Sequence, residues 1–143
     1  MRKRITWLEQ VDTAGCGIAC LAMLMGTTYA RVREAFPRFC NNCGIDPPHM
    51  DHFLAVNGYA VQRIYPERYH DGKQNAPWPP KPFAERHLVL VRQTLKDISA
   101  DSHYVVMDWQ GRVYDPADPH YTPSKLSRYF AVDWVAGVAK VTR

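Results

Sequence analysis

The chain has 143 residues, of which 46% are hydrophobic and 22% charged, and a formal net charge of +4. This length and composition are those of a globular domain, so we take residues 1–143 as a single domain. The 18 Lys and Arg residues are scattered apart from a cluster at Arg2–Arg4, whereas a nucleic-acid-binding protein more often carries a basic stripe. We therefore expect no nucleic-acid partner.

The sequence also lacks the signatures of a membrane or secreted protein. Its most apolar run, Cys16–Met25, has about half of the ~20 residues that a membrane-spanning helix needs. The basic residues at positions 2–4 are not followed by the apolar run of a signal peptide. We expect a cytoplasmic protein with no membrane partner. Its four cysteines should then serve catalysis, metal binding or packing rather than disulfide formation.

The first predicted element is a helix from about Gly15 to Met25. The segment is apolar on every face, which is typical of a buried central helix rather than a surface one. Either Asp12 or Thr13 can cap its start, and Gly26 ends it.

Two further helices are predicted after Gly26. The first begins at Thr27 or Thr28 and ends before Pro37, and the second opens at Asp46 and closes at Gly58.

After residue 58 the pattern changes to that of strands. Residues 66–83 contain five of the prolines and predict a long surface loop. Strands are predicted at residues 59–65, 87–91, 103–107, 112–115 and 132–141, with a short helix at 122–130. Because helices come first and antiparallel strands follow, the order predicts an α+β fold with the buried N-terminal helix packed on an antiparallel sheet.

Cys16 is the first candidate for chemistry. It is flanked by Gly15 and Gly17 and lies in the first turn of the predicted buried helix, where backbone N–H groups lower the pKa of a thiol. The glycines would leave the sulfur open and let a substrate backbone approach, so both are substrate-binding candidates. The alternative is a small core residue, and this interpretation suits Cys20, which lies one turn deeper in the same apolar run.

A nucleophilic cysteine needs a base, and the base needs an orienting group. His103 begins a hydrophobic strand, and Asp115 ends the strand that follows the turn at residues 108–111. In a hairpin the two residues fall opposite each other within a residue or two, close enough for a carboxylate to hold an imidazole. Gln10 lies six residues before Cys16 and could donate its amide to an oxyanion together with the Cys16 N–H.

These segments together resemble a known family. The run Gln10–Met23 is similar to the nucleophile segment of bacteriocin-processing peptidases, which cleave double-glycine leader peptides and form cysteine peptidase family thirty-nine of the papain-like superfamily. Ser102–Met107 and Gly111–Pro116 resemble the family's His strand and Asp-Pro strand, in the same order. Where the family usually has an acidic residue before the nucleophile, this chain has Gly15.

The resemblance implies a papain-like cysteine peptidase fold with Cys16 as nucleophile, His103 as general base, Asp115 as its orienting residue and Gln10 as oxyanion donor. Ser102, beside the histidine, is a further substrate-binding candidate. The reaction would be acyl transfer on a peptide or protein substrate and would require no cofactor. Members of the family are generally fused to a membrane transporter, and this sequence shows no membrane segment, so we expect a cytosolic substrate.

Two alternatives remain open. The same three catalytic residues serve amidases and acyltransferases, and the fold could instead form a non-catalytic module that binds a peptide or protein. Separately, Cys40, Cys43, His49 and His52 form a weak zinc candidate, because only five residues separate the two pairs against about twelve in common zinc fingers. A redox-active Cys-x2-Cys pair or an ordinary loop before a helix explains the same residues.

Overall fold

The computed structural model describes residues 4–37, 44–65, 80–92, 102–118, 124–129 and 131–141. Most of the predicted proline-rich loop and the start of the predicted helix at 122–130 lie outside the described residues. Two of the four candidate zinc ligands, Cys40 and Cys43, lie outside them as well.

The central element is helix α1, Cys16–Met25, and it is buried as predicted. All residues from Gly17 to Leu24 are buried, and each fully buried Leu or Met contributes about 1.5–3 kcal/mol. The helix ends at Gly26, whose φ of 66° lies in the left-handed region that favours glycine. The predicted side-chain cap is wrong, because Gly15 is the N-cap residue and no side chain caps the helix.

Helices α2, Tyr29–Glu34, and α3, Pro47–Val56, follow in chain order as predicted. Thr28 caps α2 by accepting a hydrogen bond from the Arg31 N–H. Two prolines follow the N-cap of α3, where their missing N–H groups cost nothing. No helix in the described ranges is long and apolar enough to cross a membrane.

The five described strands form one antiparallel sheet in the order β1-β5-β2-β3-β4. This arrangement confirms the predicted α+β class. The bounds are β1 Tyr59–Ile64, β2 Arg86–Arg92, β3 Ser102–Asp108, β4 Val113–Tyr114 and β5 Ala131–Lys140. In place of the predicted helix near residue 126 there is one described 3₁₀ turn, η2, Leu126–Arg128.

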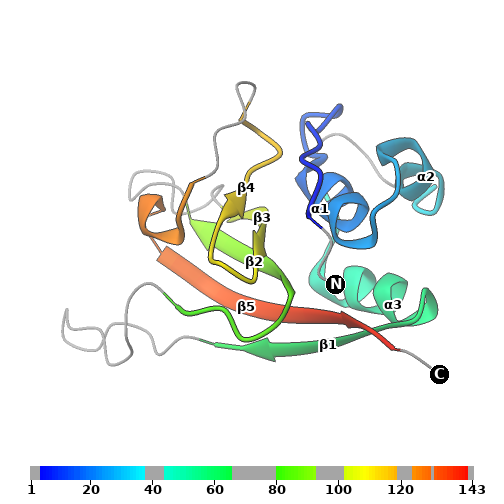
Figure 1. Ribbon diagram of the computed structural model, residues 1–143. Coiled ribbons are helices and arrows are strands. Elements are labelled where there is room, and N and C mark those ends of the chain that lie inside the picture. The colour runs from blue at the N-terminus through cyan, green and yellow to red at the C-terminus, as the bar shows by residue number, and fades with distance from the viewer. Residues whose placement is uncertain are drawn as a thin grey trace.

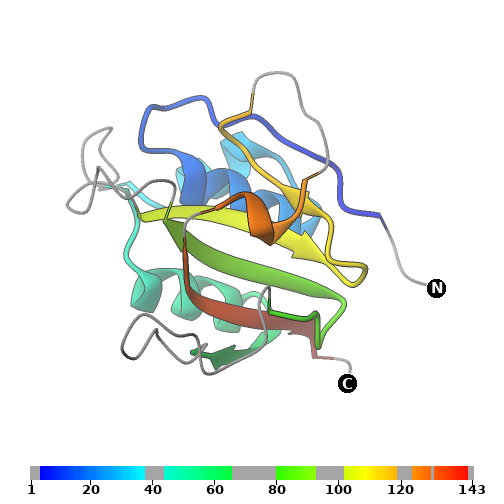
Figure 2. The same cartoon turned by 90° about the vertical axis from the view of Figure 1, so that its left-hand side faces the viewer.

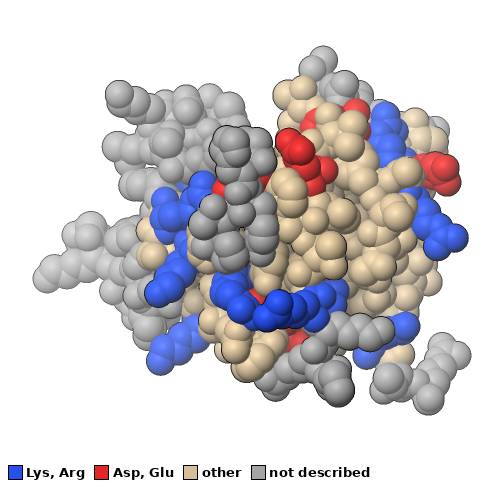
Figure 3. All heavy atoms as spheres, turned by 45° about the horizontal axis from the view of Figure 1, so that its top comes forward, with Lys and Arg blue, Asp and Glu red and all other residues tan. Residues whose placement is uncertain are grey.

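The sheet separates two hydrophobic cores. The three helices lie on one side of it and η2 on the other, as Figures 1 and 2 show. Side chains that alternate along the strands fill both sides: Leu88 and Val106 join the helical core, whereas Val89 and Val105 pack with Leu126. In the space-filling view of Figure 3, Lys and Arg side chains occur at several separate places among uncharged residues.

Candidate active site

Cys16 is the first residue of α1, directly after the N-cap Gly15. The amide of Gly15 donates to the carbonyl of Asp12 over 3.0 Å, which closes the turn that leads into the helix. The N-cap residue Gly15 has no side chain, so within the described residues it gives no cap to the first-turn N–H groups beside Cys16. The thiol is half-buried, so it sits at the surface end of an otherwise buried helix.

The surroundings of Cys16 favour the thiolate. Burial alone would raise the pKa of Cys16, but a hydrogen bond with His103 and the charge of His103 lower it below its usual value. Backbone hydrogen bonds from Tyr104 and Gly17 act in the same direction. One turn further along α1, Cys20 is completely buried, and its burial raises the pKa of its thiol well above the usual value. The pKa of the Cys16 thiol is therefore lowered, whereas that of the buried Cys20 thiol is raised.

His103 and Asp115 are in direct contact. The Nε2 atom of His103 lies 2.7 Å from Oδ1 of Asp115, and both residues are buried. Burial opposes the charged imidazolium, but hydrogen bonds with Asp115 and Cys16 outweigh it and raise the pKa of His103 to about 9. Cys16, His103 and Asp115 thus form one hydrogen-bonded chain.

The β3–β4 hairpin brings Asp115 back to His103, and Asp108 holds its turn. Oδ1 of Asp108 accepts the backbone N–H groups of Gln110 and Arg112, each over 2.9 Å. Its Oδ2 accepts from the Arg112 side chain over 2.8 Å and from the Tyr114 hydroxyl over 3.2 Å. Asp108 thus satisfies the backbone of the turn between the two strands.

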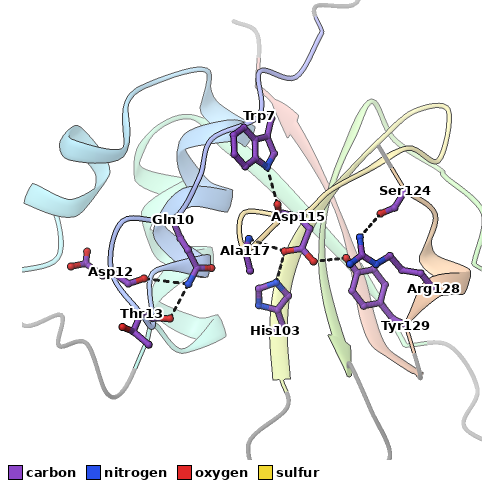
Figure 4. Close-up of polar contacts among 10 residues, drawn as sticks. All are labelled: Trp7, Gln10, Asp12, Thr13, His103, Asp115, Ala117, Ser124, Arg128 and Tyr129. Atoms are coloured by element: carbon purple, nitrogen blue, oxygen red, sulfur yellow. Dashed lines mark hydrogen bonds and ion pairs between the residues drawn. The ribbon is translucent and has the colours of Figure 1, made fainter. Parts of the chain in front are cut away.

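Asp115 has further partners that the sequence did not reveal (Figure 4). Its Oδ1 also accepts the Ala117 N–H over 2.9 Å, and its Oδ2 accepts the hydroxyl of Tyr129 over 2.7 Å. Its backbone oxygen accepts the indole N–H of Trp7 over 2.8 Å. Burial would raise the pKa of Asp115, but the hydrogen bonds, above all that from His103, lower it, so the carboxylate stays ionised. Trp7 lies 108 positions from Asp115, a separation that no local pattern bridges.

Gln10 lies in the loop before α1, anchored by its backbone N–H, which donates to the Pro116 carbonyl over 2.9 Å. Its side-chain Nε2 donates to the carbonyls of Asp12, over 3.2 Å, and Thr13, over 2.8 Å (Figure 4). Its Oε1 atom is buried and has no hydrogen-bond partner among the described residues. In this structure the amide therefore braces the loop before α1.

The two glycines that flank Cys16 have different environments. Gly15 is buried, and a Cβ atom there would overlap with the hydroxyl of Tyr29. A Cβ on Gly17 would meet Tyr104 and Met50 at ordinary contact distances of 3.5 and 3.6 Å, so Gly17 faces the core.

The remaining predicted site residues lie apart from this chain of hydrogen bonds. Ser102 is exposed at the start of β3 and pairs with Arg92 of β2. His49 and His52 are exposed on α3, and the described residues contain no group of three or more metal ligands. The zinc site stays an untested prediction, because its two cysteines lie outside the described ranges.

Comparisons with known proteins extend the picture. No family model and no curated protein matches the chain. Among solved structures, the peptidase domain of Streptococcus ComA, a bi-functional ABC transporter involved in quorum sensing, matches with a TM-score of 0.65 and 18% identity, over 96% of this chain and 99% of that one. A double-glycine motif protease from an AMS/PCAT transporter, solved with its leader peptide, matches with a TM-score of 0.65 and 16% identity, over 99% and 94% of the two chains.

The fold is that of these peptidase domains. The similarity to leader peptidases that the sequence motifs predicted is confirmed at this level, and it extends over nearly the whole chain.

Proposed function

We propose that the protein is a papain-like cysteine peptidase. The observation that carries this proposal is geometric: a partly accessible thiol is hydrogen-bonded to His103, whose Nε2 atom is held by the buried carboxylate of Asp115. This is the arrangement of a nucleophile, a base and an orienting group. Such an arrangement supports acyl transfer whichever peptide is the substrate.

In the proposed reaction the Cys16 thiolate attacks the carbonyl carbon of the scissile bond. The developing oxyanion is stabilised by N–H groups at the uncapped start of α1. His103 then gives its proton to the leaving amine, and the C–N bond breaks to leave a thioester on Cys16. Water, deprotonated by His103, attacks the thioester, and the acid product leaves as the Cys16 thiolate and the protonated His103 re-form.

Gln10 is the proposed side-chain donor to the oxyanion. Both hydrogens of its amide are directed at loop carbonyls, so donation to substrate requires the amide to release one of them. The Oε1 atom is buried and has no partner within the described part of the chain, which makes this orientation less favourable than a fully satisfied one. If the side chain rotates, its amide can give up a hydrogen bond to a loop carbonyl and donate to the oxyanion of the substrate instead.

The proposed substrate is an extended peptide with small residues before the cleaved bond. One of the structural neighbours acts on double-glycine leader peptides, and its fold covers this chain almost completely. Glycines beside the scissile bond would let the substrate backbone approach a nucleophile at the end of a buried helix. Peptides that contain a Gly-Gly pair before the cleaved bond are therefore the first substrates to test.

The test is peptide cleavage followed by mass spectrometry. Peptides that contain an internal Gly-Gly pair are incubated with wild type and with Cys16→Ser, and matched peptides carry Ala-Ala at the same positions. The proposal predicts cleavage after the second glycine by wild type only, with a thioester-linked fragment trapped on Cys16 at short times. Peptide binding without cleavage by wild type would overturn the peptidase assignment and favour a binding module.

A further inference from the structure

The carboxylate of Asp115 is held at both of its oxygen atoms. Oδ1 accepts from His103 Nε2 and from the Ala117 N–H, and Oδ2 accepts from the hydroxyl of Tyr129 over 2.7 Å. Asp115 and Tyr129 are each 5% exposed, so the hydroxyl–carboxylate bond is shielded from water. Figure 4 shows His103 and Tyr129 on different sides of Asp115.

Tyr129 is carried by a segment that is itself tied to the hairpin. Ser124 pairs with Val113 of β4 through two backbone hydrogen bonds of 2.8 and 3.2 Å. The Arg128 guanidinium lies 5.2 Å from the centre of the Tyr129 ring and donates to the Ser124 hydroxyl over 3.3 Å. The phenol is therefore fixed before any substrate binds, on the sheet face opposite the helices.

We propose that Tyr129 is a positioning residue of the active site, which sets the plane of the Asp115 carboxylate so that Oδ1 faces His103. This inference rests on the proposed peptidase function, since it assigns Tyr129 a part in the same site. The terminal torsion of an aspartate has a broad energy profile, so one hydrogen bond to Oδ1 leaves the carboxylate free to turn. A second bond, to the other oxygen, removes that freedom.

The hydroxyl also favours the ionised carboxylate. It donates a hydrogen bond to a carboxylate that burial would otherwise push toward the neutral form, which helps to hold the pKa of Asp115 below its usual value. A charged and correctly turned Asp115 stabilises the imidazolium, and the imidazolium in turn stabilises the Cys16 thiolate. Loss of the Tyr129 hydroxyl should thus raise the pKa of Cys16, although in this chain of bonds the two residues are linked only through Asp115 and His103.

The test compares Tyr129→Phe with Tyr114→Phe. Tyr114 is also 5% exposed and also donates its hydroxyl to a buried aspartate, but to Asp108 at the hairpin turn. Both variants lose the same atom from the same kind of environment. A purely structural effect should therefore lower the melting temperature of both without changing the thiol chemistry of either.

The first readout is the rate at which iodoacetamide alkylates Cys16, measured from pH 5 to pH 10. In Tyr129→Phe we expect the midpoint of the rate profile to move to higher pH and the rate at pH 6 to fall about tenfold, because a hydrogen bond to a charged group is lost. In Tyr114→Phe we expect the wild-type profile. An unchanged profile in Tyr129→Phe, or equal changes in both variants, would overturn the inference.

The second readout, turnover of a cleaved peptide, separates this inference from the peptidase assignment. We expect Tyr129→Phe to lower kcat about tenfold and to leave KM unchanged. If wild type shows a reactive Cys16 that depends on Tyr129 but cleaves no peptide, the proposed function fails and the positioning role stands. If wild type cleaves and Tyr129→Phe equals it in kcat and in alkylation profile, only the positioning role fails.

Discussion

Nε2 of His103 lies 2.7 Å from Oδ1 of Asp115, although the register of the hairpin does not place the two residues directly opposite. The pairs Val106–Tyr114 and Met107–Val113 imply that Asp115 continues the ladder opposite residue 105. The carboxylate therefore reaches His103 diagonally along the strand, a separation that these side chains can span. The orientation of the Asp115 carboxylate must then be set by groups other than the strand pairing of β3 and β4.

This geometry predicts the effect of Asp115→Asn. The amide has nearly the same shape but carries no charge, so His103 loses the partner that stabilises its protonated form and fixes its ring. We expect kcat to fall by at least about tenfold and the fold to be retained. Turnover of a cleaved peptide, with circular dichroism as the control for folding, measures this. Wild-type turnover would remove Asp115 from the site.

The pH dependence of hydrolysis follows from the raised pKa of His103. In the proposed reaction His103 gives a proton to the leaving amine; that proton is present below about pH 9 and lost above it, so kcat/KM should fall through that value. Because Asp115 raises this pKa, the alkaline limb should move to lower pH in Asp115→Asn. A limb at the same pH in both proteins would show that His103 is not the titrating acid.

Position 15 should tolerate no side chain. A Cβ on Gly15 would overlap with the Tyr29 hydroxyl, so Gly15→Ala should cost about 1–3 kcal/mol and displace the loop before Cys16. Gly17→Ala is the matched control, because its Cβ would make only ordinary contacts.

A second substitution checks the cause. Tyr29→Phe removes the overlapping atom, so Gly15→Ala should cost less in that background, although the ring carbon that bears the hydroxyl stays 3.2 Å from the added Cβ. Chemical denaturation of the four proteins in the cycle gives the coupling free energy. Additive costs would mean that the two residues do not collide.

The buried, neutral ring of His87 should make the folded protein less stable in mild acid. It is completely buried; its Nε2 accepts the N–H groups of Phe83 and Ala84, each over 3.0 Å, and its Nδ1 lies 3.1 Å from the carbonyl of Met107. A ring that accepts at Nε2 and donates at Nδ1 is neutral. Burial lowers the pKa of His87 below 6.5, so the unfolded chain takes up the proton first.

The stability that the neutral ring contributes is fully present above pH 6.5 and is lost as the pH falls from there through the folded-state pKa. The loss is at most about 1.4 kcal/mol per pH unit. Urea denaturation between pH 7 and pH 5 measures it, and His87→Gln should lack this part of the slope. His103 contributes no slope of this sign, because its pKa is raised. Parallel slopes in wild type and variant would contradict this role of His87.

The elements of the fold could be predicted because their signals are local. The apolar run of α1, the glycine at its end and the apolar run of β3 can each be recognised from neighbouring residues. The pairing of His103 with Asp115 was also within reach, since only 12 positions and one turn separate them.

The features that sequence reasoning missed depend on tertiary contacts. Asp12 looked like a helix cap, but its carboxylate accepts from Tyr29 over 2.7 Å and from Arg33 over 3.3 Å instead. Trp7 and Tyr129 reach Asp115 from opposite ends of the chain. A buried tyrosine needs a partner for its hydroxyl, but no pattern in one sequence says which acceptor it meets.

The central claim is that Cys16 is a thiolate nucleophile paired with His103, and alkylation of the intact protein tests it most directly. Limiting iodoacetamide is applied at pH 6 to wild type and to His103→Ala, and mass spectrometry locates the modified cysteine. We expect Cys16 to be alkylated first in wild type, ahead of the buried Cys20, and to lose this advantage in His103→Ala. A Cys16 that reacts no faster than the other cysteines, or equally fast without His103, would contradict the account.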